Sequence, residues 1–141
     1  FWVGNAKQSQ LFYRAAFGFK LVAYRGPETG VRDRASYLLE QGKIRLILTT
    51  PMGPEGEIAA HIAKHGDGVR DMAFWVDDCR DAYAKAIERG AVSVQEPTVL
   101  KDDHGEIVVA GIRTYGDTIH SLVERKNYRG IFMPGFVAAD N

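Results

Sequence analysis

The stretch HIAKHGDGVRDMAF (residues 61–74) lies in the middle of the chain and decides how the rest is organised. Its first five residues fit the end of a helix, and Gly66 provides the stop. The apolar residues after Gly68 then predict the start of a strand. This change of pattern predicts two units, about 1–66 and 67–136.

The first unit is predicted to run strand, helix and then three strands. FWV (1–3) predicts a strand, and AKQSQLFYRAAF (6–17) places Leu11, Phe12, Ala15 and Ala16 at helical spacing before a glycine stop. The remaining predicted segments are strands FKLVAYR (19–25), ASYLLEQ (35–41) and KIRLILTT (43–50), a loop GPETG (26–30) and a helix EGEIAAHIAKH (55–65).

The second unit repeats this order. VRDMAFWV (69–76) predicts a strand, and Asp77 or Asp78 fits the N-cap of a helix over 79–89. Three predicted strands follow: 91–100 with a kink at Pro97, 106–115 and 118–125. One βαβββ unit alone would leave a curved sheet half buried, so the sequence predicts an α+β fold of two paired units. Its sheet would be curved, mixed and partly open, with the helices outside.

Composition narrows the classes of function. The chain has 141 residues, 45% of them hydrophobic, and 18 basic residues balance 18 acidic ones. A net charge of zero gives no electrostatic reason to expect nucleic acid or an anionic membrane as partner. No apolar run approaches the length of a membrane span. The single cysteine, Cys79, cannot form an internal disulfide, which fits a reducing cytoplasm.

The ends of the chain suggest a larger protein. It opens at Phe1 without methionine, on residues already predicted as strand, and it stops in the tail MPGFVAADN (133–141), which closes nothing. We expect it to be part of a longer polypeptide.

Several long motifs resemble a known family. They are FWVGNAKQ (1–8), AYRGPETG (23–30), KHGDGVRDMAF (64–74), TYGDTIHSLVER (114–125) and NYRGIFMPGF (127–136). Together they are similar to the N-terminal half of the 4-hydroxyphenylpyruvate dioxygenase family, and the resemblance covers essentially the whole chain. It implies the vicinal oxygen chelate fold, built from paired βαβββ modules.

The resemblance also implies an activity for the complete protein. Members of the family bind one non-haem Fe(II) through two histidines and a glutamate in their second half. They convert 4-hydroxyphenylpyruvate and O2 to homogentisate and CO2 in tyrosine catabolism. This half would be a metal-free, cytoplasmic domain with a structural and oligomerisation role. Its partners would be the C-terminal catalytic domain of the same polypeptide and further copies in a homo-oligomer.

In this family the two halves of the chain are related, so each metal-ligand position of the catalytic half has a counterpart in this half. The resemblance matches them to Phe1, Asp71 and Ser121. A phenyl ring donates nothing to a metal, a serine hydroxyl is a poor ligand, and one carboxylate does not hold the ion alone. We therefore predict no catalytic, cofactor-binding or metal-binding residue in this chain.

Two histidines offer the sharpest alternative. His61 and His65 are four residues apart, as paired zinc ligands are, but Ile62 stands where the zincin motif needs glutamate. A structural role explains more, because Lys64 and His65 fall in a last helical turn, where positive charge suits the dipole.

The carboxylates of residues 67–78 and 102–106 are also explained by structural roles. Asp67, Asp77 and Asp78 fit turn and N-cap positions. Asp71 fits a strand residue that is expected to face the barrel interior and to be either hydrogen-bonded or ion-paired. DDHGE (102–106) fits a hairpin loop in which Gly105 takes the awkward dihedral.

The remaining candidate site residues are weaker candidates for a catalytic role. His120 is expected to be a packed core or interface residue, and Cys79 sits where a helix dipole would lower a thiol pKa, although no histidine is nearby in sequence. The aromatic residues expected in the core, or at a contact if exposed, are Trp2, Phe74, Trp75 and Tyr83.

Three rival functions stay open. Hydroxymandelate synthase is similar in architecture and uses the same substrate, and its deciding residues would lie outside this chain. A free-standing, metal-free binding protein of the bleomycin-resistance type would need the chain to be complete and to hold an apolar cavity. Glyoxalase I is weaker, because the ligand positions are not filled.

Overall fold

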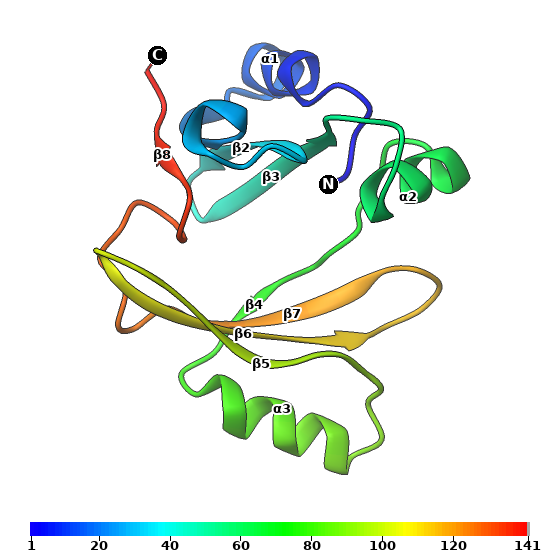
Figure 1. The fold of residues 1–141 in the computed structure, drawn as a ribbon, viewed down its shortest axis with the longest axis vertical. Coiled ribbons are helices and arrows are strands. Elements are labelled where there is room, and N and C mark those ends of the chain that lie inside the picture. Colours follow the sequence, from blue (N-terminus) through cyan, green and yellow to red (C-terminus); the bar gives the residue numbers. More distant parts are fainter. Residues whose placement is uncertain (141) are drawn as a thin grey trace. The chain divides into compact units, whose positions relative to one another are not determined.

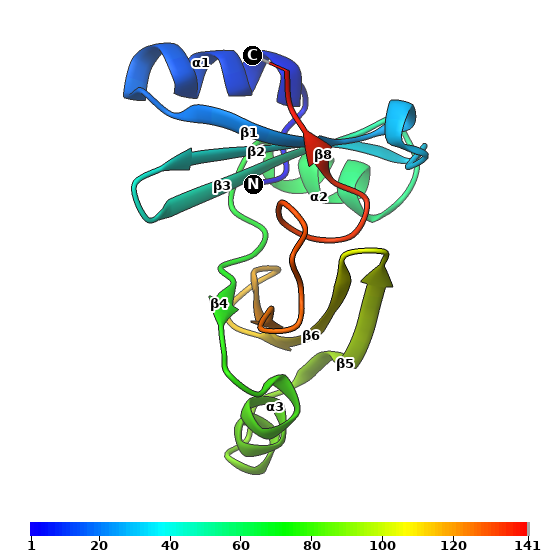
Figure 2. The same ribbon diagram turned by 90° about the vertical axis from the view of Figure 1, so that its left-hand side faces the viewer.

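A computed structural model describes residues 1–140 of the chain. They form two compact units, one made of Phe1–Gly68 and the segment from Gly135 onward, the other of Val69–Pro134. Each unit has a four-stranded sheet with a helix across one face (Figures 1 and 2). None of the helices within residues 1–140 is long and apolar enough to cross a bilayer.

The first unit has its strands in the order β3-β2-β1-β8. All of its strand pairs are antiparallel. Its elements are α1 (Ala6–Phe17), β1 (Lys20–Arg25), the 3-10 turn η1 (Pro27–Thr29), β2 (Arg34–Gln41), β3 (Ile44–Pro51), α2 (Glu57–His65) and β8 (Val137–Ala138).

Helix α1 begins and ends as the sequence predicts. Asn5 caps its start, since the Asn5 side chain accepts a hydrogen bond from the backbone of Gln8 at 3.0 Å. Gly18 ends it in the left-handed region at φ 76°, which a residue with a Cβ rarely adopts. Both signals are local, so the helix is confirmed to the residue.

The core of the first unit lies between α1 and the sheet. Tyr13 of α1 packs against a cluster of buried residues: Val3, Ala6, Leu21, Leu39 and Leu48. The residues that gave α1 its helical spacing are not in this core. Leu11, Phe12, Ala15 and Ala16 are all exposed.

Two segments of the first unit differ from the sequence prediction. Residues 1–3 form no continuous strand, and only Trp2 makes isolated bridges, to Thr49 and Gly68. The expectation that the C-terminal tail closes nothing is wrong, because β8 pairs with β1 and forms the edge of the sheet. Asn141 lies outside the described residues.

The second unit has its strands in the order β4-β7-β6-β5. Its sheet is mixed as expected, since β4 and β7 are parallel while the other pairs are antiparallel. Its elements are β4 (Phe74–Trp75), α3 (Cys79–Glu88), β5 (Ser93–Asp102), β6 (Gly105–Arg113) and β7 (Ile119–Glu124).

The two faces of this second sheet have separate cores. On one face, α3 contributes Cys79 to a cluster with Val108, Ala110 and Leu122. On the other face, Ile107, Val109 and Val123 pack against Tyr128 and Met133. The alternation along β6 and β7 is that of strands buried on both sides.

The signals that start α3 and bend β5 are confirmed, but the first strand is shorter than predicted. Asp78 is the N-cap of α3 and accepts from the backbone of Asp81 at 2.9 Å. The register of β5 shifts between Gln95 and Thr98, around the predicted kink at Pro97. Of residues 69–76, only Phe74–Trp75 forms a strand, and both side chains are about half exposed.

Candidate functional site

Two of the three positions matched to metal ligands come together in the second unit. Asp71 makes an isolated parallel bridge to Ile119 at the start of β7, two residues before Ser121. One carboxylate oxygen of Asp71 accepts a hydrogen bond from the backbone N–H of Ser121 at 2.9 Å. The other accepts from the Ser121 hydroxyl at 2.5 Å. Both oxygens of a partly buried carboxylate are therefore engaged by one residue of β7.

The same face of the sheet carries an arginine among aromatic rings. The Arg125 guanidinium lies 5.2 Å from the ring of Trp75 and 5.8 Å from that of Tyr128. It also donates to the carbonyl of Phe132 at 2.8 Å. Cation–π contacts of this length hold a positive charge close to Trp75, which pairs with Val123 beside Ser121.

This donor set does not fit a divalent iron. Asp71 offers its oxygens to two N–H and O–H donors, and Ser121 offers only a hydroxyl. Within residues 1–140, no group of three or more His, Cys, Asp or Glu side chains is placed to hold a metal ion. The arrangement joins the segment before β4 to β7 by hydrogen bonds instead.

The third matched position, Phe1, belongs to the core of the first unit. Its ring lies 6.1 Å from that of Tyr13 on α1 and packs against the buried cluster under the helix. A side chain directed at the helix is an apolar packing residue.

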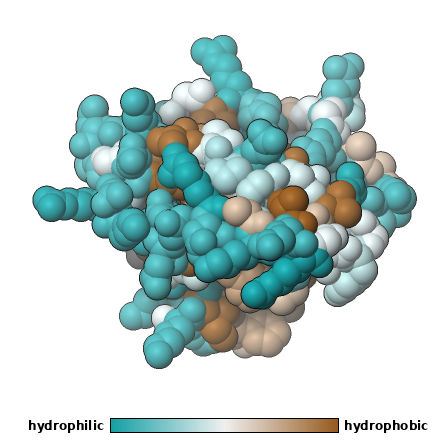
Figure 3. Space-filling model, turned by 90° about the horizontal axis from the view of Figure 1, so that it is seen from below, coloured by the Kyte–Doolittle hydropathy of each residue, from teal (hydrophilic) through white to brown (hydrophobic). Residues whose placement is uncertain are grey.

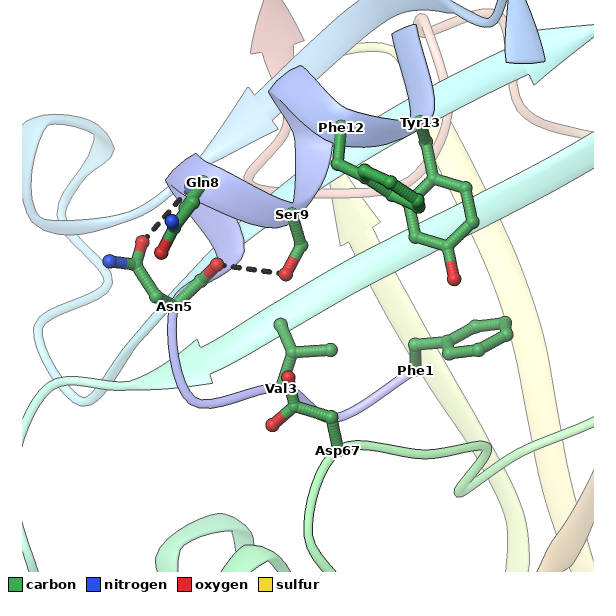
Figure 4. Close-up of a pocket in the computed structure, with 8 residues that line it drawn as sticks. All are labelled: Phe1, Val3, Asn5, Gln8, Ser9, Phe12, Tyr13 and Asp67. Atoms are coloured by element: carbon green, nitrogen blue, oxygen red, sulfur yellow. Dashed lines mark hydrogen bonds between the residues drawn. The ribbon is translucent and has the colours of Figure 1, made fainter. Parts of the chain in front are cut away.

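A hollow of about 420 Å³ opens beside this ring in the first unit, between the start of α1 and the segment around Asp67 (Figure 4). Asp67 accepts from the backbone of Gly4 at 2.8 Å. The lining residues are Phe1, Val3, Asn5, Gln8, Ser9, Phe12, Tyr13 and Asp67. Sequence reasoning did not find this hollow.

The histidine pair on α2 is packed within its own unit. The rings of His61 and His65 are 4.6 Å apart, and the edge of His61 meets Trp2 at 5.1 Å. Lys64 and His65 lie in the last turn of the helix, and Gly66 ends it at φ 72°. The structural explanation given from the sequence is confirmed in its helix-end geometry.

The DDHGE loop is a hairpin turn fastened by the C-terminal NYRG segment. Tyr128 donates to Asp102 at 2.9 Å, and Arg129 donates its backbone N–H to the carbonyl of His104 at 2.9 Å. Gly105 has φ 121°, and a Cβ there would lie 2.1 Å from the carbonyl oxygen of Asn127. Glycine is therefore required by both the dihedral and the close approach.

The pKa of Tyr128 is raised in this position. Burial, and then its hydrogen bond to Asp102, raise the pKa of Tyr128 to about 12. A similar tie exists in the first unit, where Tyr24 donates to Glu28 at 2.5 Å. Burial and that hydrogen bond also raise the pKa of Tyr24. These two tyrosine–carboxylate pairs were missed at the level of sequence, because nothing local marks the acceptor.

The remaining candidates have structural partners. A ring nitrogen of His120 lies 2.9 Å from the carbonyl oxygen of Met72, and its ring is 5.1 Å from that of Phe74. Cys79 is fully buried and its thiol donates to the carbonyl of Leu122 at 3.3 Å. The expected lowering of its thiol pKa is wrong, because burial, and then the nearby Glu124 carboxylate, raise the pKa of Cys79.

Comparison with known proteins gives consistent matches. The family described as hydroxyphenylpyruvate dioxygenase, N-terminal, matches residues 4–133. A 4-hydroxyphenylpyruvate dioxygenase of Tetrahymena thermophila is 47% identical over 98% of this chain, and one of Xenopus tropicalis is 48% identical over 96%. The chain spans 35% of the length of each of these relatives.

Solved structures extend the likeness to the fold. A mutant of 4-hydroxymandelate synthase from Streptomyces coelicolor is 28% identical, with a TM-score of 0.86, over 98% of this chain and 39% of its own. Methylmalonyl-CoA epimerase from Mycobacterium tuberculosis has a TM-score of 0.69 at 20% identity, over 86% of this chain and 81% of its own. The expected α+β fold of the vicinal oxygen chelate type is confirmed.

Proposed function

This chain belongs to the family of 4-hydroxyphenylpyruvate dioxygenase N-terminal domains, and on that premise we propose that it is the metal-free domain of such an enzyme. The complete polypeptide would convert 4-hydroxyphenylpyruvate and O2 to homogentisate and CO2, with Fe(II) held in a C-terminal catalytic domain. The part described here would form one domain of two βαβββ units, about 1–66 and 67–136. It would work in the cytoplasm and contribute no catalytic, cofactor-binding or metal-binding residue.

The pairing of Asp71 with Ser121 is the observation that carries this proposal. A metal ligand needs free lone pairs directed at a common point, together with further donors. Here both oxygens of the Asp71 carboxylate accept hydrogen bonds from Ser121, one from its backbone N–H at 2.9 Å and one from its hydroxyl at 2.5 Å. The contact supports a domain in which hydrogen bonds to β7 occupy the positions matched to metal ligands.

The surface supports a role in holding other parts of the protein. Phe74 and Trp75 are 51% and 53% exposed on the short strand β4. Large apolar side chains left half exposed are typical of contact surfaces. We propose that such surfaces bind the catalytic domain or another subunit of a homo-oligomer.

Iron binding by the 141-residue chain tests the metal-free assignment. The chain is titrated with Fe(II) under anaerobic conditions by calorimetry, and the retained metal is measured after gel filtration. We expect far less than one equivalent, and no homogentisate from 4-hydroxyphenylpyruvate. Retention of one tightly bound iron per chain would overturn the assignment, and its persistence in Asp71→Ala would place that iron elsewhere.

The mass and the activity of the polypeptide made by the source organism test the proposals that the chain continues into a catalytic domain and that the complete protein forms homogentisate. We expect an intact mass more than twice the 15.6 kDa of this chain, and homogentisate as the product. The likeness to 4-hydroxymandelate synthase makes that activity the second candidate, and 4-hydroxymandelate as product would establish it instead. An intact mass near 15.6 kDa would favour a free-standing binding protein of the same fold.

A further inference from the structure

The hollow of the first unit combines aromatic rings with polar side chains (Figure 4). Phe12 and Tyr13 hang from α1 above the ring of Phe1, and the ring of Tyr13 lies 5.5 Å from that of Phe12 and 6.1 Å from that of Phe1. The polar lining residues are Asn5, Gln8, Ser9 and Asp67. The volume of about 420 Å³ falls within the range of roughly 300 to 1,000 Å³ that is typical of small-molecule sites.

Hydrogen bonds to two separate segments hold the floor of the hollow in place. The backbone N–H of Val3 donates to the carbonyl of Thr49 on β3 at 2.9 Å. The carbonyl of Gly4 accepts from the hydroxyl of Thr50 at 2.9 Å, and the Gly4 N–H donates to Asp67 at 2.8 Å. The hollow is therefore formed before a ligand arrives, so binding costs little additional ordering of the chain.

Three polar groups on the lining residues are available to a ligand. Within residues 1–140, the Tyr13 hydroxyl has no hydrogen-bond partner, and Asp67 engages only the carboxylate oxygen that accepts from Gly4. Asn5 uses its side-chain oxygen to cap α1, which leaves its NH2 group without a partner in the same part of the chain. Polar groups that a fold leaves open beside aromatic rings are what fixes the orientation of a small ligand.

The charge of the lining selects the kind of ligand. Asp67 is the only one of the 8 lining residues, all of them within the described part of the chain, whose side chain is charged at neutral pH. The start of α1 adds a partial positive charge, but the oxygen of Asn5 already meets the N–H of Gln8 there. An anion would meet Asp67 without a counter-charge. An ammonium group would instead be attracted by the carboxylate and by the faces of the rings.

We propose that this hollow binds a small aromatic amine of the arylalkylamine class. The ring of the ligand packs against Phe1, Phe12 and Tyr13, and its ammonium group donates to the open oxygen of Asp67. The same charge disfavours an aromatic carboxylate of equal size, and the substrate of the reaction proposed above belongs to that class. The inference goes beyond the proposed function and does not depend on it.

The openness of the hollow sets the strength of binding. Phe12 is 58% exposed, so one side of the ligand stays in contact with water. A probe such as phenethylamine has roughly nine non-hydrogen atoms, each of which contributes modestly to binding. We therefore expect a dissociation constant of about 0.1 to 1 mM.

Titration of the isotope-labelled chain, followed by NMR, tests the site. Phenethylamine is expected to shift the backbone amide signals of Ser9 and Asp67 saturably. Phenethyl alcohol, which has the same skeleton without the charge, should bind about tenfold more weakly. Phenylacetate should give no saturable shift below about 10 mM. Absence of saturable shifts with phenethylamine, or equal affinity for all three probes, would overturn the proposal.

Charge variants test the role of the carboxylate. Asp67→Asn keeps an oxygen for the Gly4 N–H but removes the charge, so phenethylamine should bind about tenfold more weakly, as the alcohol does. Glu55→Gln is the matched control, because it removes one negative charge from an exposed residue of the same unit that does not line the hollow. Its effect should be less than about twofold. Equal losses in the two variants would mean general attraction of a cation, and would overturn the proposal.

Ring variants test the aromatic wall. Phe12→Ala removes an exposed side chain that lines the hollow, and should weaken phenethylamine binding about fivefold with unchanged circular dichroism. Leu11→Ala is the matched control, since Leu11 is 60% exposed on the same helix but does not line the hollow. It should leave binding unchanged. A loss in Leu11→Ala as large as that in Phe12→Ala would place the ligand outside the hollow.

These readouts are separate from those of the proposed function. A chain that binds neither iron nor phenethylamine would leave the metal-free assignment standing and remove this site. A chain that binds one iron, and phenethylamine at Asp67, would do the reverse.

Discussion

Helices α1 and α3 hold the same place in their two units but have opposite outer surfaces. Each follows the first segment of a βαβββ unit and covers one face of a four-stranded sheet. The outer side of α3 is polar, and Lys85 pairs there with Asp81 at 2.7 Å. The face of the molecule seen in Figure 3, where α3 lies, is mostly hydrophilic with small separate apolar patches. The outer side of α1 is Leu11, Phe12 and alanine.

This difference shows which part of a helix the fold constrains. Both helices keep an inward side that packs on a sheet, through Ala6 and Tyr13 in α1 and through Cys79 and Tyr83 in α3. Burial of that side is sufficient to hold the helix, so the outer side is free to follow another requirement. A charged outer side suits water, and an apolar one suits a partner.

The tyrosine–carboxylate pairs of the two units differ in reach. In the second unit, Tyr128 reaches Asp102 across 26 residues. In the first, Tyr24 reaches Glu28, four residues away. Both units also have long-range polar contacts: Asp71 accepts from Ser121 across 50 residues in the second, and Asp67 accepts from Gly4 across 63 in the first. The following experiments test contacts of the second unit in order of expected effect.

The hairpin at Gly105 should be the most sensitive point. Gly105→Ala forces a Cβ to within 2.1 Å of the Asn127 carbonyl at φ 121°, so the free energy of unfolding should fall by about 3 kcal/mol. Gly116→Ala is the control, with φ 58° and no heavy atom within 4 Å of its Cβ. It should lose about 1 kcal/mol. Urea denaturation compares the two, and equal losses would mean that the NYRG segment does not press on the hairpin.

The Asp71–Ser121 pair should come next. Removing a part-buried carboxylate that accepts two hydrogen bonds from β7 should cost about 2 kcal/mol in Asp71→Ala. A double-mutant cycle with Ser121→Ala should give a coupling energy of about 1 kcal/mol. Asp77→Ala, an exposed neighbour, should change stability by less than about 0.5 kcal/mol. A coupling near zero would remove the tie as a stabilising feature.

The hydrogen bond from Tyr128 to Asp102 should make the stability of the protein depend on pH. Its pKa is raised by burial and by Asp102 from 10.0 to about 12, so the unfolded chain loses this proton first as the pH rises. The stability contributed is complete below pH 10 and is lost as the pH rises towards 12. Tyr128→Phe should cost about 1 kcal/mol at neutral pH and flatten the alkaline decline of the urea midpoint. Parallel declines in both proteins would contradict the assignment.

The ion pair on α3 should matter least. Lys85 and Asp81 are both exposed, so water and salt screen their attraction. Lys85→Ala should change the melting temperature by about 1 °C or less, with the change vanishing in 1 M salt. A larger effect would mean that the polar side of α3 supports the second unit rather than merely facing water.

The sequence by itself determined the elements whose signals are local. Gly18 ends α1, Gly66 ends α2, and of the two expected caps, Asp77 and Asp78, it is Asp78 that starts α3. Caps and glycine stops act within a few residues. The repeat of βαβββ order and the family resemblance gave the fold and located the three positions that cannot hold iron. A hydrogen-bonded or ion-paired structural role was also expected for Asp71, and its carboxylate accepts two hydrogen bonds from Ser121.

Only the tertiary structure decided which side of each element is covered. It joined Asp71 to Ser121 and β8 to β1, and it raised rather than lowered the pKa of Cys79. It also left the apolar side of α1 facing water, although the spacing of Leu11 and Phe12 alone predicts only a helix. Caps and periodicity depend on neighbours in the chain, whereas burial and strand pairing depend on residues tens of positions away.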